Sequence, residues 1–245
     1  MKIGINGTSL IPPITGVGKY TLELCRELNN LLPEATFIVF CQKQIDLPCE
    51  NNRWELHVNR IPLFGALWVK FILGILCNKK DVEIFWSPSP RLPYFFKNGI
   101  RTFVTVHDLV HILFPGSMIF KHMVSNRLFF KKDILNANYI FSNSNSTSIR
   151  LKSHFGREAN FIVKPGVGDI YKPIKKEIII LCLRKYNINS PYMMTLSTKE
   201  PRKNFETLVE SFIELKNEKI LNNELLVLVG GEGWNVRNLN INQRK

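Results

Sequence analysis

Two glycines at the start of a predicted helix are the first residues whose type and spacing could do chemistry. Gly16 and Gly18 stand where a Gly/Pro/Thr-rich loop over residues 7–18 meets a helix predicted from the apolar spacing of residues 20–31. Glycines at such a place let backbone amides approach a phosphate or a sugar. Plain turn glycines explain the pattern equally well. Thr21 stands where a dinucleotide fingerprint has its third glycine, so an NAD site is not expected.

An imidazole follows a predicted strand further along the chain. His107 and Asp108 come directly after the apolar run of residues 102–106. The carboxyl ends of parallel strands carry the ligand sites of open α/β sheets, and a histidine there can orient a sugar hydroxyl or accept its hydrogen bond. A structural histidine is the alternative. His111 lies four residues on, but a zinc-binding helix would carry glutamate after the first histidine, so no metal site is expected.

A pair of cations precedes another predicted helix. Arg202 and Lys203 fall between a strand predicted over residues 192–196 and a helix predicted over residues 204–216. Positive charge opposes the helix dipole at this end. A guanidinium and an ammonium are explained there if they bind a diphosphate together with the helix amides. A solvated charge cluster is the alternative interpretation.

Short runs rich in Val, Ile and Phe alternate with helical patterns, which predicts an α/β fold with a parallel sheet. Strands are expected near residues 2–6, 37–41, 56–58, 82–86, 102–106 and 139–141, and helices over residues 20–31, 61–77 and 120–135. After a Gly- and Pro-rich connector over residues 164–173, the alternation restarts, with a linking helix near residues 178–186 and strands over residues 192–196 and 225–229. The predicted organisation is a complete Rossmann-like N-terminal domain over 1–172, a linker over 173–190, the start of a second Rossmann-like domain over 191–234, and an irregular tail over 235–245.

Composition and charge narrow the class of protein. Apolar residues make up 45% and charged residues 22% of the chain, which is typical of globular proteins and not of disordered or coiled-coil ones. The net charge is +13, and residues 101–185 alone carry +9, which favours phosphate, nucleic acid or an anionic membrane as a partner. No nucleic-acid-binding module is recognisable, so nucleic acid is not expected.

The cysteines and the most apolar stretch of the sequence bear on where in the cell the protein is located. The five cysteines show neither disulfide nor zinc-site spacing, and no export signal precedes the first strand, so a cytoplasmic location is expected. Residues 61–77 contain Lys70 and are shorter than the roughly 20 apolar residues that a spanning helix needs. We interpret them as a buried or interfacial helix, compatible with peripheral attachment to the inner membrane face.

Six short motifs, in chain order, carry a family resemblance. They are Gly16-Val17-Gly18-Lys19-Tyr20, Trp86-Ser87-Pro88 with Arg91-Leu92-Pro93, Val106-His107-Asp108-Leu109, Pro165-Gly166-Val167, Glu200-Pro201-Arg202-Lys203-Asn204 and Val229-Gly230-Gly231-Glu232-Gly233-Trp234. This set, covering about residues 1–234, resembles glycosyltransferase family 4, the retaining enzymes of GT-B fold, and particularly its mannosyltransferase-like members of bacterial polysaccharide assembly.

The resemblance implies a two-domain enzyme that transfers a sugar from a nucleotide-diphosphate sugar to a lipid-linked or saccharide acceptor. Configuration would be retained, and neither a metal nor another cofactor would be required. Gly16 and Gly18 would line the cleft near the diphosphate, and His107 would be the catalytic residue that contacts the transferred sugar. Arg202 and Lys203 would neutralise the charge that grows on the diphosphate as the glycosidic bond breaks.

Two departures from the family pattern are visible. Ser197-Thr198 stand where the family usually has a small glycine before its Glu-Pro-Arg-Lys segment. The family's acidic donor-binding motif, two glutamates separated by seven residues, is absent from residues 235–245. We therefore expect a truncated glycosyltransferase that is inactive alone. The alternative is a non-catalytic binding subunit that pairs with a chain supplying the missing donor lobe.

Overall fold

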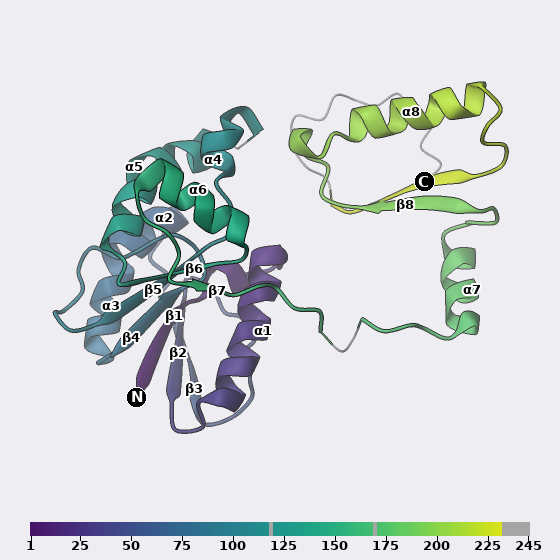
Figure 1. The fold of residues 1–245 in the computed structure, drawn as a ribbon. Coiled ribbons are helices and arrows are strands. Elements are labelled where there is room, and N and C mark those ends of the chain that lie inside the picture. The colour runs from purple at the N-terminus through teal and green to yellow at the C-terminus, as the bar shows by residue number, and fades with distance from the viewer. Residues whose placement is uncertain (118–119, 169–170, 232–245) are drawn as a thin grey trace. The chain divides into compact units, whose positions relative to one another are not determined.

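The computed structural model describes residues 1–117, 120–168 and 171–231 (Figure 1). The chain divides into two compact units, one of which comprises Met1–Leu113 with Phe120–Gly168. The other takes in the chain beyond Gly168 together with the short segment Phe114–Ile119. The predicted tail over residues 235–245 and the end of the last motif, from Glu232 to Trp234, lie outside the described residues.

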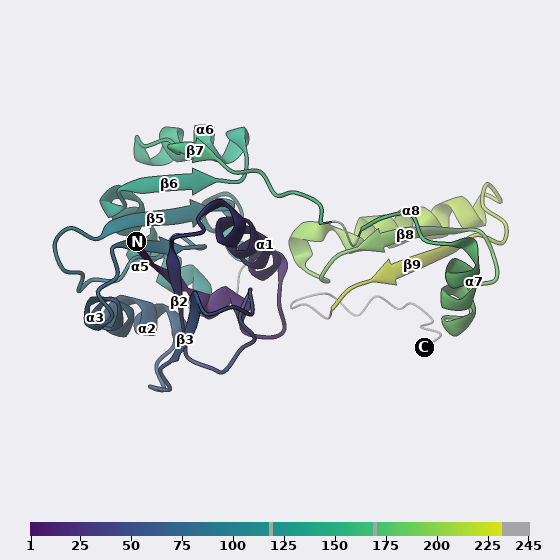
Figure 2. The same cartoon turned by 90° about the horizontal axis from the view of Figure 1, so that it is seen from below.

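A seven-stranded parallel sheet forms the centre of the first unit. Its strand order is β3-β2-β1-β4-β5-β6-β7, and the arrows of β5 and β6 point the same way in Figure 2. The strands are β1 (Lys2–Asn6), β2 (Thr36–Cys41), β3 (Trp54–Val58), β4 (Ile84–Ser87), β5 (Arg101–Val106), β6 (Tyr139–Ser142) and β7 (Phe161–Ile162). The predicted α/β fold with a parallel sheet is confirmed. Strand β7 was not predicted, because two residues give no periodicity to recognise.

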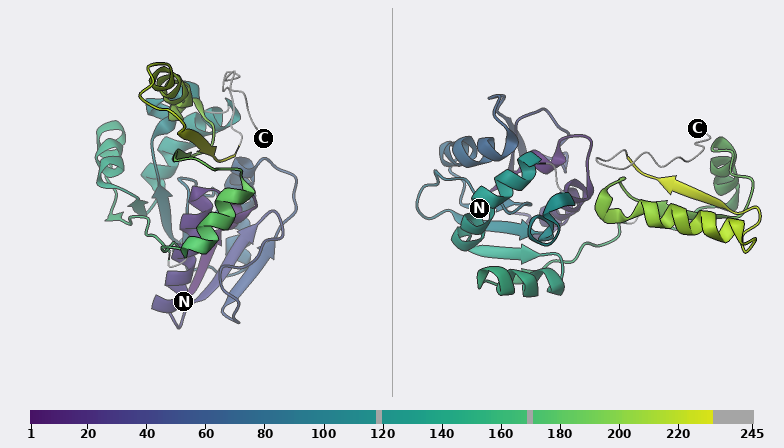
Figure 3. Two further views of the ribbon diagram at one scale, coloured as in Figure 1. Left: turned by 90° about the vertical axis from the view of Figure 1, so that its right-hand side faces the viewer. Right: turned by 90° about the horizontal axis from the view of Figure 1, so that it is seen from above.

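Helices cover both faces of this sheet (Figures 1 and 3). On one face lies α1 (Gly16–Leu31), and the core of the other face takes side chains from α2 (Gly65–Trp68), the π-helical turn η2 (Val69–Leu73), α3 (Gly74–Lys79), α5 (Phe120–Asn136) and α6 (Asn145–Phe155). The alternation within β1 follows from this layering. Ile3 and Ile5 enter the core beneath α1, whereas a Cβ at Gly4 would meet Phe40 and Val82 of the opposite core.

Three segments differ from the sequence predictions by more than a small shift at the ends of an element. Helix α6 was missed, although its Ser144 side chain accepts a hydrogen bond from the Thr147 N–H and Gly156 ends it in the left-handed conformation at φ 70°. The helix predicted over residues 61–77 begins at Gly65 and continues through α3 to Lys79. The loop predicted over residues 7–18 contains the 3-10 turn η1 (Gly7–Leu10) and the first turn of α1.

The second unit contains a two-stranded parallel sheet and two helices. Its elements are α7 (Lys176–Lys185), β8 (Tyr192–Leu196), the 3-10 turn η4 (Pro201–Lys203), α8 (Phe205–Asn217) and β9 (Leu225–Val229). Helix α8 runs alongside the two strands (Figures 1 and 3) and buries Phe205 and Val209. Gly230 has φ 144°, and a Cβ there would overlap the carbonyl oxygen of Ser197, so only glycine fits where β9 ends against β8.

Candidate functional site

The sheet of the first unit reverses its winding direction between β1 and β4. From β1 the chain adds β2 and β3 on one side, and then crosses over to add β4 to β7 on the other. Ligands of open α/β sheets bind outside the carboxyl ends of the strands at such a switch point. Asn6 ends β1 and Ser87 ends β4, and the Asn6 Nδ2 donates a hydrogen bond to the Ser87 Oγ at 3.1 Å. The two strands that flank the switch point are therefore linked by polar side chains.

Both members of this pair also order the loops that follow them. The Asn6 Oδ1 accepts hydrogen bonds from the N–H and the Oγ1 of Thr8, at 3.2 and 2.9 Å, and so fixes the turn η1. The Ser87 Oγ lies 3.3 Å from the Ser89 Oγ. Sequence reasoning did not single out Asn6 as a site residue. The signal was present, because a polar residue follows the apolar centre of each of two strands that the winding rule makes neighbours.

His107 follows β5 at the same edge and is held from several sides. Its Nε2 lies 3.0 Å from the carbonyl oxygen of Pro88, and its ring meets the Tyr20 ring edge-on with centroids 4.9 Å apart. The Thr147 Oγ1 donates to the His107 carbonyl oxygen at 3.2 Å, which attaches α6 to the same position. The imidazole is thus fixed against α1 and against the loop that follows β4.

The electrostatic setting of His107 determines which of its nitrogen atoms can accept a hydrogen bond. Burial lowers the pKa of this imidazole, and the hydrogen bond to Pro88 and the charge of Asp108 oppose the shift only in part. The ring is therefore neutral at pH 7. A carbonyl oxygen can only accept, so the Nε2 carries the proton and the Nδ1 keeps the lone pair. Such an imidazole can accept a hydrogen bond from a hydroxyl group.

The two predicted site glycines have different surroundings. A Cβ at Gly18 would overlap the Ser9 carbonyl oxygen and lie 2.7 Å from the Ile14 Cγ2, so this glycine allows the loop before α1 to pack against the helix. A Cβ at Gly16 would meet no described atom within 4 Å. In the described structure, the Thr15 side chain does not cap α1, which leaves the helix's first amides as donors for a ligand. Gly16 fits a ligand-facing role better than Gly18 does.

The proline-rich loop after β4 forms hydrogen bonds with the helices that cover the sheet face opposite α1. Arg91 donates to the Ser125 Oγ at 3.2 Å and also contacts the Asn126 Oδ1, both on α5. The Lys70 Nζ donates to the Leu92 carbonyl oxygen at 2.8 Å. Burial lowers the pKa of Arg91, and the charge of Asp133 opposes this shift. These cations position the loop that supplies the Pro88 carbonyl.

The predicted diphosphate-binding cations belong to the second unit. Arg202 and Lys203 lie in the turn η4, and Asn204, at φ 52°, separates this turn from α8. They therefore precede the helix instead of occupying its first turn, where Glu206 stands. Lys203 is exposed, and the side chain of Arg202 lies outside the described part of the structure. Of the predicted site residues, Gly16, Gly18 and His107 belong to the first unit, where Tyr20 of α1 joins the helix that begins at Gly16 to the His107 ring.

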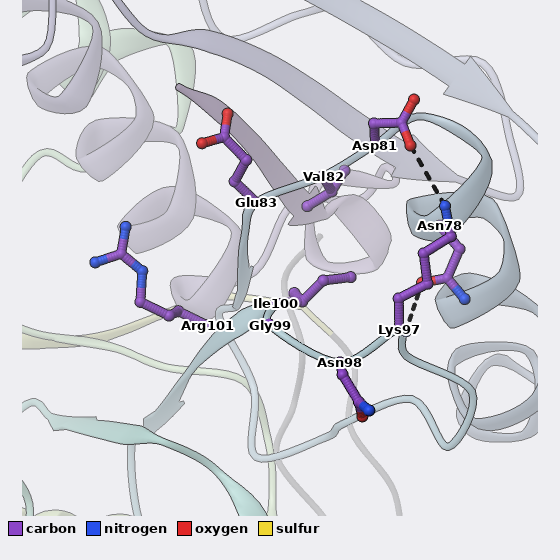
Figure 4. A pocket seen from close by; sticks show the side chains of 9 residues that line it. All are labelled: Asn78, Asp81, Val82, Glu83, Lys97, Asn98, Gly99, Ile100 and Arg101. Carbon is purple, nitrogen blue, oxygen red and sulfur yellow. Dashed lines mark hydrogen bonds and ion pairs between the residues drawn. The ribbon is translucent and has the colours of Figure 1, made fainter.

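A separate hollow lies at the opposite, amino-terminal edge of the sheet. It measures about 350 Å³ and is formed by residues around the starts of β4 and β5, with Lys97 and Asp81 paired at 3.4 Å on its wall (Figure 4). Its lining shares no residue with the surroundings of His107. Among residues 1–117, 120–168 and 171–231, no group of three or more His, Cys, Asp or Glu side chains could hold a metal ion.

The winding, the parallel sheet and the second strand-helix-strand unit define an α/β protein with the GT-B type of fold. Two solved structures show this likeness. WaaG, a glycosyltransferase involved in lipopolysaccharide biosynthesis, has a TM-score of 0.66 and 14% identity, over 95% of this chain and 64% of that chain. A glycosyltransferase from Rickettsia africae ESF-5 has a TM-score of 0.52 and 15% identity, over 94% of this chain and 68% of that chain.

These likenesses show the fold, since the identities are low. The chain spans just under two thirds of the length of WaaG, at 64%. No protein-family model matches the sequence, and no curated protein sequence matches it. The assignment of an activity therefore depends on the site itself.

Proposed function

We propose that this protein acts in sugar transfer, taking a sugar from a nucleotide-diphosphate sugar and passing it to a lipid-linked or saccharide acceptor. The observation that carries the proposal is the neutral His107, held by Pro88 at the switch-point edge of a GT-B type fold. The likeness to WaaG, described as a lipopolysaccharide-biosynthesis enzyme, supports bacterial surface polysaccharide synthesis as the setting. Mannose is the first sugar to test.

In this proposal each site residue has a defined task. The Nδ1 of His107 accepts a hydrogen bond from a hydroxyl of the transferred sugar and fixes the sugar relative to the bond that breaks. The open first turn of α1 at Gly16 offers backbone amides to the diphosphate. Arg202 and Lys203 neutralise the leaving diphosphate, a task that a metal ion performs in many other enzymes. The transfer retains configuration, as in the family that the motifs resemble.

A second candidate is a binding subunit that pairs with a chain completing the donor lobe. Two observations on the described residues favour it. The sheet of the second unit has two strands, and none of the residues of α7 is buried although Ile178 and Leu181 are apolar. Binding of nucleotide sugars without turnover, together with co-purification of a second polypeptide, would support this candidate over transfer by the chain itself.

Calorimetric titration with a panel of UDP-, GDP-, ADP- and dTDP-sugars tests the main proposal. We expect one nucleotide class to bind and His107→Ala to weaken binding of the whole nucleotide sugar at least ~10-fold, about 1.4 kcal/mol, as for loss of one or two hydrogen bonds. His154→Ala is the matched control, since His154 is exposed on α6. The free nucleoside diphosphate should bind equally to the wild type and to His107→Ala, because the imidazole contacts the sugar.

Two results would contradict this assignment. One is the absence of binding for every nucleotide sugar in the panel by a protein whose circular dichroism shows the α/β fold. The other is an equal loss of affinity in His107→Ala and His154→Ala. If binding is found, incubation with the matching radiolabelled nucleotide sugar and a bacterial lipid extract then separates transfer from binding alone.

A further inference from the structure

The helical segment from Gly65 to Lys79 differs from an ordinary surface helix, because it carries apolar residues on its exposed side as well as on its buried side. Lys70, the cation in its middle, is 0% exposed and pairs with Asp133 of α5, while its Nζ also donates to the Leu92 carbonyl oxygen. Phe71, the next residue, is 41% exposed. Burying an ammonium group costs free energy unless the group is paired, and Lys70 is paired within the core in this way.

The outward side of this segment forms part of a continuous apolar surface. The Phe71 ring lies 5.5 Å from the Tyr94 ring and 6.3 Å from the Phe95 ring, measured between centroids. Phe95 is 51% exposed. We call the following exposed residues the aromatic stripe: Phe64, Leu67, Phe71, Ile75, Tyr94 and Phe95. Large apolar side chains that are exposed together in this way mark an interaction site.

Cations of α5 stand beside the aromatic stripe. The Lys121 Nζ lies 5.7 Å from the centroid of the Phe64 ring, and the Lys132 Nζ lies 5.1 Å from that of the Tyr94 ring. Lys121, Leu128 and Lys132 share one face of α5 by their spacing, and Leu128 is exposed. The acidic residue of this helix, Asp133, is buried against Lys70. Residues 56–132 hold eleven Lys and Arg but three Asp and Glu.

Apolar rings flanked by uncompensated lysines match the surface of an anionic lipid bilayer. Aromatic side chains are favoured at the level of the lipid headgroups, and lysines near the surface are attracted to anionic headgroups. In the part of the chain that the structure describes, no helix is long and apolar enough to cross a membrane. A segment of this kind lies along the interface, with its apolar side inserted between the headgroups.

We propose that the aromatic stripe, with Lys121 and Lys132, docks the protein onto an anionic membrane surface. The inference does not depend on sugar transfer. It also places the bilayer next to the proline-rich loop, because Tyr94 and Phe95 belong to the same loop as Pro88. Hydrogen bonds of Lys70 and Arg91 hold this loop in position. A lipid-linked acceptor would then be presented from the side on which that loop lies.

Flotation with liposomes tests the proposal directly on the full chain. Vesicles of phosphatidylcholine with about 30 mol% of the anionic lipid phosphatidylglycerol are compared with pure phosphatidylcholine vesicles. We expect a partition coefficient at least ~10-fold higher on the anionic vesicles at low salt, falling as salt is added. Phe71→Ser with Phe95→Ser should lower it ~10-fold or more through lost insertion, and Lys121→Glu with Lys132→Glu by at least as much.

Matched changes on the opposite face of the sheet serve as controls. Leu31→Ser and Arg26→Glu alter exposed residues of α1 and should leave vesicle binding unchanged. Salt-independent binding, equal binding to neutral vesicles, or equal losses in the α1 controls would overturn the proposal. So would a concentration-dependent dimer that Phe71→Ser dissolves in the absence of any vesicle binding, since a second copy would then occupy the stripe. If the serine variants fold poorly, the comparison of Lys121→Glu with Lys132→Glu against Arg26→Glu still locates the docking surface, because each change replaces exposed positive charge on one face of the sheet.

Discussion

The contrast between Gly16 and Gly18 makes the sharpest prediction about the edge of the candidate site. Both glycines lie in the first turn of α1, and sequence reasoning assigned both to the ligand cleft. A Cβ at Gly18 would overlap the Ser9 carbonyl oxygen, which belongs to the backbone and cannot rotate away. A Cβ at Gly16 would meet no described atom within 4 Å. Alanine at the two positions therefore has opposite consequences.

The magnitudes follow from these contacts. At Gly18 the new methyl group would also lie 2.7 Å from the Ile14 Cγ2, well inside ordinary van der Waals distance, so the loop and the helix must separate. Overpacking of this kind costs about 2–3 kcal/mol. Gly16→Ala removes chain entropy from the unfolded state without a clash and should stabilise the protein by about 0.5 kcal/mol. In melting temperature the first change amounts to a loss of about 5–10 °C.

Urea unfolding followed by tryptophan fluorescence is a suitable assay, because Trp54, Trp68 and Trp86 are all buried in the first unit. Gly18→Ala should lower the midpoint, and Gly16→Ala should leave it unchanged or raise it. In calorimetry, Gly16→Ala should weaken nucleotide-sugar binding by about 1 kcal/mol, roughly fivefold, if the ligand approaches this turn. A Gly18→Ala protein as stable as the wild type would refute the packing argument. A Gly16→Ala protein with unchanged affinity would remove the turn from the site.

Three further predictions concern buried charge, a helix end and pH. Lys70→Met leaves the Asp133 carboxylate buried without its partner and should cost about 3–5 kcal/mol. Lys70→Met with Asp133→Leu should cost less, about 1–2 kcal/mol, because only the Leu92 carbonyl then loses its donor; urea unfolding compares the two variants, and similar losses would contradict the account. Arg157→Ala should lower the free energy of unfolding by about 1–3 kcal/mol, because this guanidinium donates to four main-chain carbonyls at the end of α5. Lys152→Ala removes one partner of an exposed ion pair and should change the free energy of unfolding by no more than about 0.5 kcal/mol. The pKa of His107 is lowered in the folded state, so the contribution of this residue to stability and the lone pair of its Nδ1 are present above pH 6.5 and are lost as the pH falls through the folded pKa. Nucleotide-sugar affinity measured from pH 8 to pH 5 should show this loss in the wild type, and His107→Ala should not show it.

Much of both sheets could be predicted from sequence because their strands are short, apolar and bounded by turn residues. The strands over residues 2–6, 192–196 and 225–229 coincide with β1, β8 and β9. The α/β architecture followed from the alternation of strand-like and helix-like runs. Helix α6 was not predicted because its apolar residues are few. The sequence marks this helix mainly by its capping residues, the Ser144 hydroxyl at one end and Gly156 at the other.

The candidate site was harder to predict, because its parts are joined by contacts that sequence spacing does not reveal. The winding rule brings Asn6 beside Ser87, 81 positions apart in sequence, and neither residue belongs to a recognisable catalytic pattern by itself. The environment of His107 depends on a carbonyl 19 positions earlier and on the ring of Tyr20. The separate roles of Gly16 and Gly18 depend on where the Ser9 carbonyl lies, which sequence spacing does not specify.

The position of His107 is in turn connected to the surface that we propose docks on lipid. The loop after β4 supplies Pro88 to the imidazole at one end and Tyr94 to the aromatic stripe at the other. Between them, Arg91 is fastened to α5, and the Leu92 carbonyl accepts a hydrogen bond from the buried Lys70. The stripe and the imidazole are therefore in contact with the same loop, and these hydrogen bonds fix the loop between them. The burial of Lys70 therefore has two consequences, since it keeps the charge of Lys70 away from the exposed Phe71 and secures the loop that supplies Pro88.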